Sequence, residues 1–162
     1  MKRLILIRHS KSSWKDLSLN DFNRPLNGRG KSDGPLMAAY LKNKINKIDY
    51  LHSSSSVRTF ETSKYFINQI QFEKVEYDDS LYHCSATSLL NIISNYSDDY
   101  QSVMIIAHNP GLTNLINKIT NFYLDNLPTT GLAEIRFNIN SWSDIAFENS
   151  NLVDLKFPKQ LK

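Results

Sequence analysis

The segment Leu4-Ile5-Leu6-Ile7-Arg8-His9 is the most informative part of the sequence for the fold. Four aliphatic residues run without interruption and are followed at once by a guanidinium and an imidazole. An unbroken apolar run of this length is typical of a strand buried on both faces of a largely parallel sheet. A second run of this kind, Val103-Met104-Ile105-Ile106-Ala107, also precedes a histidine, His108. The two runs predict the central strands of an α/β fold.

Strand and helix patterns alternate along the rest of the chain. We predict further strands at 48–51 and 74–77, an outer strand at 132–137 and one more at 145–147. Helical patterns cover 29–44, 56–70, 87–96 and 110–120. Their expected start signals are Asn27, Ser54 or Ser55, and Pro110, with an irregular first turn at Pro35. Because the apolar faces of these helices must cover the sheet, we expect a three-layer αβα sandwich with a mostly parallel sheet.

Composition is that of an ordinary globular protein. Hydrophobic residues make up 41% and charged residues 22% of 162 residues, which excludes disordered, collagen-like and coiled-coil chains. We expect a single domain over residues 1–162. The formal net charge is +3, and no run of five or six like charges occurs, so no nucleic-acid-binding arm is expected.

Cysteine content and hydropathy give an expectation about the compartment. The single Cys84 cannot form an internal disulfide, and Arg8 interrupts the first apolar run too early for a signal-peptide core. No stretch approaches the ~18 to 20 apolar residues needed to span a bilayer. We expect a cytoplasmic protein without a membrane segment.

Three segments share a layout in which a strand ends in polar residues: 7–9, 51–58 and 107–110. In open α/β sheets, ligands bind at the carboxyl ends of the strands. If the three strands are parallel neighbours, this edge holds four cationic or basic side chains, Arg8, His9, Arg58 and His108. Buried positive charge needs a partner, and planar guanidinium groups match phosphate oxygens. The layout therefore predicts a phosphoryl ligand.

Other readings of the polar residues lead to weaker predictions. His52 and His83 lack a comparable setting, and we expect surface or packing roles for both. The run 53–56 is expected to form a turn and a helix cap, whose N–H groups could help hold a phosphate. A metal site at His9 and His108 is the competing use of these imidazoles. Two nearby arginines, no flanking carboxylate and no metal-binding spacing argue against it, so we expect no metal.

Four ordered motifs resemble those of the histidine phosphatase superfamily, the phosphoglycerate-mutase-like fold, in its short SixA-like branch. They run from Leu6 to Trp14, Asp21 to Gly30, Ser53 to Thr62 and Ala107 to Leu112. Thr130-Gly131-Leu132-Ala133 and Trp142 fit the C-terminal strands of that branch. The resemblance therefore covers nearly the whole chain.

The resemblance implies roles for the matching residues, which are catalytic for His9, Arg8, Arg58 and His108 and substrate-binding for Ser12 and Arg24. His9 would be the nucleophile that becomes phosphorylated, and the other three catalytic residues would clamp the phosphoryl oxygens. Arg24 is expected near the pocket rim, and it could equally be a structural ion-pair residue. The chemistry agrees, because an imidazole can attack phosphorus in line while guanidinium groups stabilise the oxygens. We expect neither a metal nor another cofactor.

The general acid is where this chain departs from its relatives. Asn109 follows the second histidine, where the phytase-like acid phosphatases have Asp, and mutases use a Glu supplied after a middle strand. The corresponding region here is 78–82, in which Asp79 is a candidate acid, although an acidic pair in a loop is more often a solvated turn. Ser10 also replaces the Gly of many members, and a side chain of this size should still fit.

A missing acid favours a leaving group that needs little protonation. An imidazole leaves from a phosphoramidate more easily than an alkoxide leaves from an ester, since the reference pKa of imidazole is about 6.5. We therefore predict a metal-independent phosphatase that acts through phospho-His9 on phosphohistidine in a partner protein. The short chain has no obvious insertion that could cover the pocket. This agrees with a protein side chain as the substrate, which needs an open site. The alternatives are a phosphatase of a small phosphorylated metabolite and a non-catalytic phosphate-binding domain.

Overall fold

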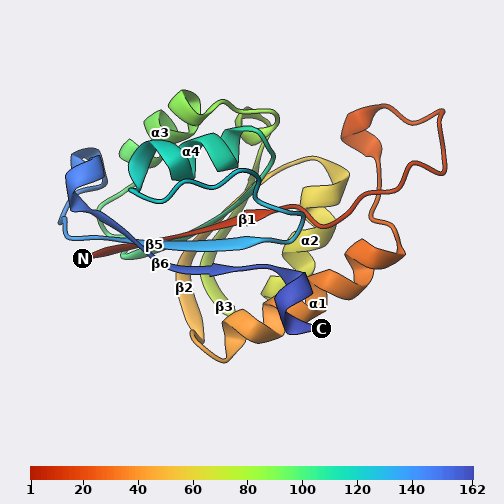
Figure 1. Cartoon of the computed structure of the whole chain (residues 1–162), viewed down its shortest axis with the longest axis horizontal. Helices are drawn as coiled ribbons and strands as arrows, with labels where there is room; N and C mark the ends of the chain where they lie inside the picture. Colours follow the sequence, from red (N-terminus) through yellow and green to blue (C-terminus); the bar gives the residue numbers. More distant parts are fainter.

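The computed structural model describes residues 1–162 and shows one six-stranded sheet with helices on both faces (Figure 1). The strands are β1 Lys2–Arg8, β2 Lys47–Ser54, β3 Gln71–Asp78, β4 Ser102–Ala107, β5 Leu132–Phe137 and β6 Ser150–Lys156. The helices are α1 Gly28–Lys42, α2 Val57–Ile67, α3 Ala86–Ser94 and α4 Gly111–Ile119. This alternation of strands and helices confirms the predicted α/β class.

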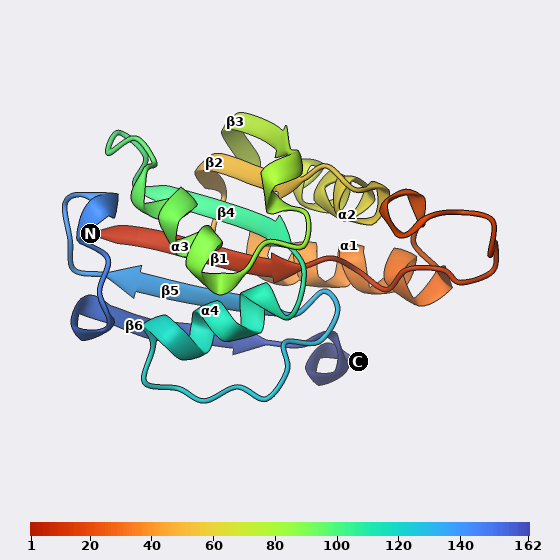
Figure 2. The same cartoon turned by 90° about the horizontal axis from the view of Figure 1, so that it is seen from above.

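The sheet has the strand order β3-β2-β4-β1-β5-β6. β3, β2, β4 and β1 are parallel, whereas β5 is antiparallel to β1 and β6 is antiparallel to β5. The sheet is therefore mostly parallel, as predicted. The carboxyl ends of β2, β4 and β1 meet at one edge, and the long loop between β1 and α1 extends beyond that edge (Figure 2).

Two apolar clusters sandwich the sheet. Leu4 and Leu6 of β1 belong to the cluster under α3 and α4, and Ile5 and Ile7 belong to the cluster under α1 and α2. All four side chains are fully buried, which explains the unbroken apolar run, and each contributes roughly 1.5 to 3 kcal/mol of burial free energy. The predicted three-layer αβα arrangement is thus confirmed. No helix combines the length and the apolar character that crossing a membrane requires.

The strand predicted at 145–147 is wrong. Residues Trp142–Asp144 and Phe147–Asn149 form two short 3-10 helices, and the last strand is β6. The reason is local hydrogen bonding, because the Ser141 hydroxyl accepts the N–H of Ser143 and the Asn149 side chain accepts the N–H of Ala146. Side chains that satisfy backbone groups locally compete with a strand ladder. Pairing with β5 therefore starts only at Ser150.

Two helix starts also differ from expectation. Ser53 and Ser54 are not a turn but the buried end of β2, and α2 is preceded by Ser56 instead of Ser54 or Ser55. Pro35 lies inside α1 and not in an irregular first turn. The residues after the proline include the buried Met37, which packs on the sheet, and this packing outweighs the backbone hydrogen bond that proline lacks.

The loop after β1 is held against α1 by a close approach at Gly30. The backbone carbonyl of Lys11 accepts the N–H of Asn27 at 2.9 Å, and the Asn27 side chain caps α1 by accepting the N–H of Gly30 at 2.9 Å. A Cβ atom on Gly30 would lie only 2.2 Å from the Lys11 carbonyl oxygen. The position of the loop therefore depends on the missing side chain at residue 30.

We predict that Gly30→Ala lowers the free energy of unfolding by about 1–3 kcal/mol, because the added methyl group displaces the backbone of Lys11. Gly28→Ala is the matched control, since a Cβ there meets no atom within 4 Å. The control should be neutral or slightly stabilising, because alanine restricts the unfolded chain. Urea unfolding of both variants measures the difference, and equal effects would contradict the close approach.

Candidate active site

A small pocket of about 220 Å³ opens at the carboxyl edge of the parallel strands. Its lining consists of Arg8, His9, Lys11, Ser12, Trp14, Arg24, Arg58, His83, His108, Asn109 and Thr129. All six site residues predicted from the sequence belong to this lining. Residues more than 90 positions apart in the chain thus meet in one place.

The strand order explains why these side chains converge. Arg8 is the last residue of β1 and His9 follows it, while His108 directly follows β4, the neighbour of β1. Arg58 lies in the first turn of α2, just after β2 on the other side of β4. The edge formed by β2, β4 and β1 therefore supplies the four residues expected to be catalytic.

His9 is a buried imidazole in a defined tautomer. Its Nδ1 lies 2.8 Å from the carbonyl oxygen of Ser10, and a carbonyl can only accept, so Nδ1 carries the proton and Nε2 keeps its lone pair. Burial lowers the pKa of His9 to about 3, and the positive charges of Arg58 and Arg8 act in the same direction. At neutral pH the side chain is thus an uncharged imidazole with a free lone pair, which is the form of a nucleophile.

His108 lies beside His9, with the ring centroids 5.2 Å apart. Its Nδ1 accepts from the Arg58 guanidinium at 3.4 Å, so its Nε2 carries the proton and donates to the Ser54 hydroxyl at 2.8 Å. Burial lowers the pKa of His108 well below its usual range, and the neighbouring His9 and Arg58 lower it further. Two neutral imidazoles therefore stand together at the pocket.

Arg8 and Arg58 supply the positive charge of the pocket. Arg8 donates from Nη1 to the carbonyl of Leu127 at 3.0 Å, but its buried Nε has no hydrogen-bond partner in the protein. Burial and the nearby Arg58 lower the pKa of the Arg8 guanidinium. An unpaired buried donor costs about 1–3 kcal/mol, and the cost is larger for a charged group. An anion in the pocket would remove this cost, so Arg8 is suited to bind one.

Asp21 is a member of the site that sequence reasoning did not single out. One of its carboxylate oxygens accepts from Arg58 at 2.9 Å, from the Tyr82 hydroxyl and from His83 at 3.1 Å, and the other accepts from Arg24 at 3.1 Å. Burial alone would raise the pKa of Asp21, but hydrogen bonds from Tyr82 and Arg58 hold it far below its usual range. The carboxylate is therefore ionised. The sequence signal that could have identified Asp21 is its position at the start of the motif 21–30.

Ser12 and Arg24 lie together on one wall of the pocket. Arg24 donates to the Ser12 hydroxyl at 2.6 Å and to the carbonyl of Ser13 at 3.1 Å, and its guanidinium stacks 3.3 Å over the Trp14 ring. Arg24 thus lines the pocket and is buried, and it also forms the ion pair with Asp21 that the sequence left open as its alternative role. Its contacts fix the shape of the loop that carries Ser12.

The loop after β3 brings His83, and not Asp79, to the pocket. Asp79 is exposed, accepts a hydrogen bond from the Ser55 hydroxyl and does not belong to the pocket lining. His83 was expected to have a surface or packing role, and its side chain is indeed 53% exposed, but it lines the pocket and contacts Asp21. That expectation was incomplete, because no sequence pattern indicated that the loop after β3 folds back onto the pocket.

Ser10 fits the floor of the pocket in place of glycine. It is fully buried, and its hydroxyl accepts from the Thr130 hydroxyl at 2.7 Å. Thr130 has a φ of 59°, in the left-handed region, and its N–H donates to the carbonyls of Arg8 and His9 at 3.0 and 3.1 Å. A β-branched residue rarely adopts this conformation. The strained turn at Thr130 therefore fixes the backbone of Arg8 and His9.

A possible metal-ligand set lies outside this pocket. His52, Glu76 and Asp78 place ligand atoms within 4.8 Å of one another. Each already has partners: His52 bonds with Tyr96 at 2.7 Å and Asp78 at 3.0 Å, and Glu76 pairs with a lysine at 2.8 Å. His52 is buried, in agreement with the expected packing role. The group is a satisfied hydrogen-bond network between β2 and β3.

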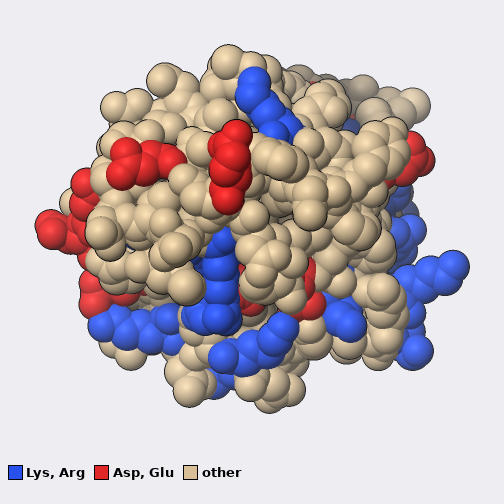
Figure 3. Space-filling model, turned by 60° about the vertical axis from the view of Figure 1, so that its left-hand side comes forward, with Lys and Arg blue, Asp and Glu red and all other residues tan.

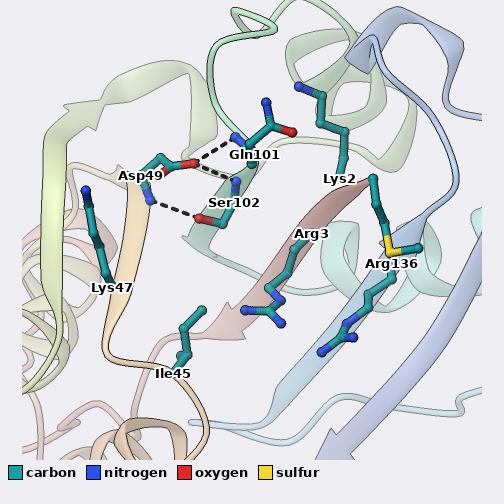
Figure 4. A pocket seen from close by; sticks show the side chains of 9 residues that line it. Lys2, Arg3, Ile45, Lys47, Asp49, Gln101, Ser102 and Arg136 are labelled. Atoms are coloured by element: carbon teal, nitrogen blue, oxygen red, sulfur yellow. Dashed lines mark hydrogen bonds between the residues drawn. The ribbon is translucent and has the colours of Figure 1, made fainter.

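The opposite end of the sheet is also basic but has a different character. Figure 3 shows Lys and Arg side chains gathered mainly over the lower half of the face where β1 begins. A hollow of about 360 Å³ at that end is lined by Met1, Lys2, Arg3, Ile45, Lys47, Asp49, Gln101, Ser102 and Arg136 (Figure 4). Arg3 and Arg136 both pair with Glu134 at 3.0 Å, and Asp49 accepts the N–H groups of two neighbouring residues. This hollow holds no histidine and no unpartnered arginine.

We predict that the two neutral imidazoles make stability depend on pH. Between about pH 6.5 and 3 the unfolded chain binds protons at His9 and His108 and the folded protein does not. The free energy of unfolding therefore falls as the pH is lowered, by up to about 1.4 kcal/mol per pH unit for each histidine. Urea unfolding at pH 7 and pH 5 should show a smaller loss for His9→Asn than for the wild type. Equal losses would mean that His9 titrates normally.

Similarity to known proteins supports a phosphatase site in this pocket. Residues 4–89 match the model of the histidine phosphatase superfamily (branch 1). An uncharacterized chloroplastic protein of Arabidopsis thaliana is 33% identical over 153 residues, which cover 88% of this chain and 70% of the relative. The family-model match over residues 4–89 includes most of β1 together with α1 and α2, and it therefore includes Arg8, His9 and Arg58 of the pocket.

Solved structures have the same fold. SixA from Agrobacterium tumefaciens, a protein assigned as a phosphohistidine phosphatase, superimposes with a TM-score of 0.80 at 25% identity, over 97% of this chain and 98% of that chain. The protein histidine phosphatase SixA complexed with tungstate gives a TM-score of 0.77 at 20% identity, over 99% of both chains. The chain therefore belongs to branch 1 of the histidine phosphatase superfamily and is a phosphatase.

Proposed function

We propose that residues 1–162 form a single domain that removes the phosphoryl group from a phosphorylated histidine of a partner protein, without a metal ion. The observation that carries this proposal is the neutral His9, whose Nε2 lone pair is free beside the guanidinium groups of Arg8 and Arg58. The similarity to SixA from Agrobacterium tumefaciens supports the substrate class. We further propose that this protein acts in the cytoplasm.

In the first step His9 attacks the phosphorus atom. A bond forms between Nε2 of His9 and phosphorus while the bond from phosphorus to the leaving group breaks. Arg8 and Arg58 bind the phosphoryl oxygens and stabilise the charge of the transition state. A dianionic phosphoryl group also raises the pKa of a neighbouring imidazole, so His108 can take up a proton and donate it in a hydrogen bond. The protein itself supplies the charge that a metal ion would otherwise provide.

In the second step water hydrolyses phospho-His9. The water oxygen attacks phosphorus, the bond to Nε2 breaks, and inorganic phosphate is released. The hydrogen bond from Nδ1–H of His9 to the Ser10 carbonyl keeps the ring in one orientation through both steps. His9 therefore returns to the same neutral tautomer from which the reaction started.

Two features of the pocket support a protein side chain as the substrate. The pocket measures about 220 Å³, below the ~300 to 1,000 Å³ of usual small-molecule sites, so it suits a phosphoryl group with the rest of the substrate outside. Asp21, the carboxylate that contacts Arg58 and His83, is ionised and cannot serve as an acid, and Asp79 does not belong to the pocket lining. Because neither of these carboxyl groups can protonate an alkoxide leaving group, a small-metabolite phosphatase is the less favoured alternative.

We predict that a brief reaction with a labelled phosphodonor leaves phosphate on His9, in a form that is stable to alkali and labile to acid. The free Nε2 lone pair makes His9 the nucleophile, so His9→Ala should show neither label nor turnover. The reaction is carried out in EDTA, because Arg8 and Arg58 make a metal unnecessary. Label on another residue, or loss of activity in EDTA with recovery on adding a divalent metal, would exclude the proposed mechanism.

We also predict a substrate order. A protein carrying phosphohistidine and p-nitrophenyl phosphate should have higher kcat/KM values than alkyl phosphates, because their leaving groups need little protonation. An alkoxide must be protonated as it leaves, and the ionised Asp21 cannot supply that proton, so alkyl phosphates should react slowest. Steady-state assays of phosphate release on the three substrate classes give the order. If sugar phosphates prove to be the best substrates, the metabolite-phosphatase alternative is correct.

A further inference from the structure

We propose that His83 is a catalytic residue that donates a proton to the leaving group and is oriented for this by Asp21. The inference rests on the proposed phosphorylation of His9, but not on the identity of the physiological substrate. It concerns the loop after β3, which contains the 3-10 helix Asp79–Leu81 and continues to Ala86 at the start of α3. No sequence motif pointed to His83.

The backbone conformation of His83 brings its side chain to the pocket. His83 has a φ of 53°, in the left-handed region that residues other than glycine seldom adopt. Its Nε2 lies 3.1 Å from a carboxylate oxygen of Asp21, and its ring centroid lies 5.4 Å from that of His108. Backbone strain of this kind persists only where surrounding contacts hold it, and it clusters at functional sites.

His83 lies on the side of the pocket from which a leaving group departs. His9 is 7% exposed and stands at the bottom, whereas the side chain of His83 is 53% exposed and stands at the mouth. In-line displacement requires the leaving atom to point away from Nε2 of His9, toward the mouth. With Nε2 of His83 held by Asp21, its Nδ1 is the nitrogen available to the leaving atom.

The other proton-bearing groups of the pocket are less suited to this step. Asp21 is ionised, and the Tyr82 hydroxyl already donates to it; burial and Asp21 raise the pKa of Tyr82. The Asn109 amide donates to the carbonyl of Leu127 at 2.8 Å. Lys11 carries an ammonium, which is a much weaker acid than an imidazolium. His83 is therefore the side chain of the lining whose chemistry matches a donor.

The proton balance closes over the two steps. In the first, His83 as imidazolium gives its Nδ1 proton to the leaving oxygen or nitrogen as the bond to phosphorus breaks. In the second, neutral His83 takes a proton from the water that attacks phospho-His9, so the imidazolium is restored when phosphate leaves. Asp21 accepts from Nε2–H throughout and keeps the ring oriented. His83 and Asp21 together extend the activity to substrates with more basic leaving groups. These substrates react more slowly than phosphohistidine.

The experiment compares leaving groups of rising basicity, from p-nitrophenyl phosphate through phenyl phosphate to an alkyl phosphate. His83→Gln should change kcat/KM for p-nitrophenyl phosphate by less than about threefold and lower it about 10²- to 10⁴-fold for the alkyl phosphate, as expected for a lost general acid. Asp79→Asn is the matched control on the same loop, and its activity should equal that of the wild type across the series.

A second variant separates chemistry from folding. Glycine adopts a positive φ without strain, so His83→Gly keeps the loop conformation and removes the imidazole. Added imidazole should restore the hydrolysis of phenyl phosphate by this variant and leave the wild type unchanged. A loss of equal size for all leaving groups, no loss at all, or no rescue by imidazole would overturn the proposal. Failure of the phosphohistidine substrate alone would reject the proposed function and leave the role of His83 standing.

Discussion

The parallel register between β1 and β4 is the constraint on which the site depends. Arg8 pairs with Ala107, so the next residue of each strand is a histidine, and the two imidazoles leave the sheet side by side. A one-residue slip would turn the following side chains to opposite faces. The apolar residues of β1 oppose such a slip, because each of them is fully buried against one of the two helical layers. The same residues that stabilise the core therefore align the nucleophile with its neighbour.

Charge balance explains how the protein tolerates this cluster without an anion. Arg58 and Arg24 share the carboxylate of Asp21, while Arg8 has only the Leu127 carbonyl as a hydrogen-bond acceptor. Burying a charge without compensation costs free energy. The ionised carboxylate of Asp21 compensates part of the positive charge of the two arginines that it contacts. A phosphoryl group must then compete with Asp21 for Arg58. Such competition favours ligands with two negative charges over ligands with one, which suits a phosphatase.

The sequence predicted those parts of the molecule that periodicity and strand-end chemistry determine. The unbroken runs at 4–7 and 103–107 indicated the central strands, and the polar residues after them indicated which side chains meet. Asp21 and His83 were not predicted, because neither comes directly after a strand: both lie well inside the irregular loops that follow β1 and β3. The strand at 145–147 failed for a related reason, since the side chain of Asn149 satisfies a backbone group that the apolar pattern had assigned to a ladder.

The two non-glycine residues with positive φ, Thr130 and His83, both flank the pocket. Each such conformation costs of order 1–3 kcal/mol, and it persists only where the surroundings over-determine it. Thr130 is held by the carbonyls of Arg8 and His9, and His83 by Asp21, so in both cases the contact that holds the strain involves a pocket residue. Thr130, at the floor of the pocket, is fully buried, whereas His83, at its mouth, lies on an exposed loop. The two positive-φ residues are thus held by contacts that also position Arg8 and His9 at the floor and His83 at the mouth.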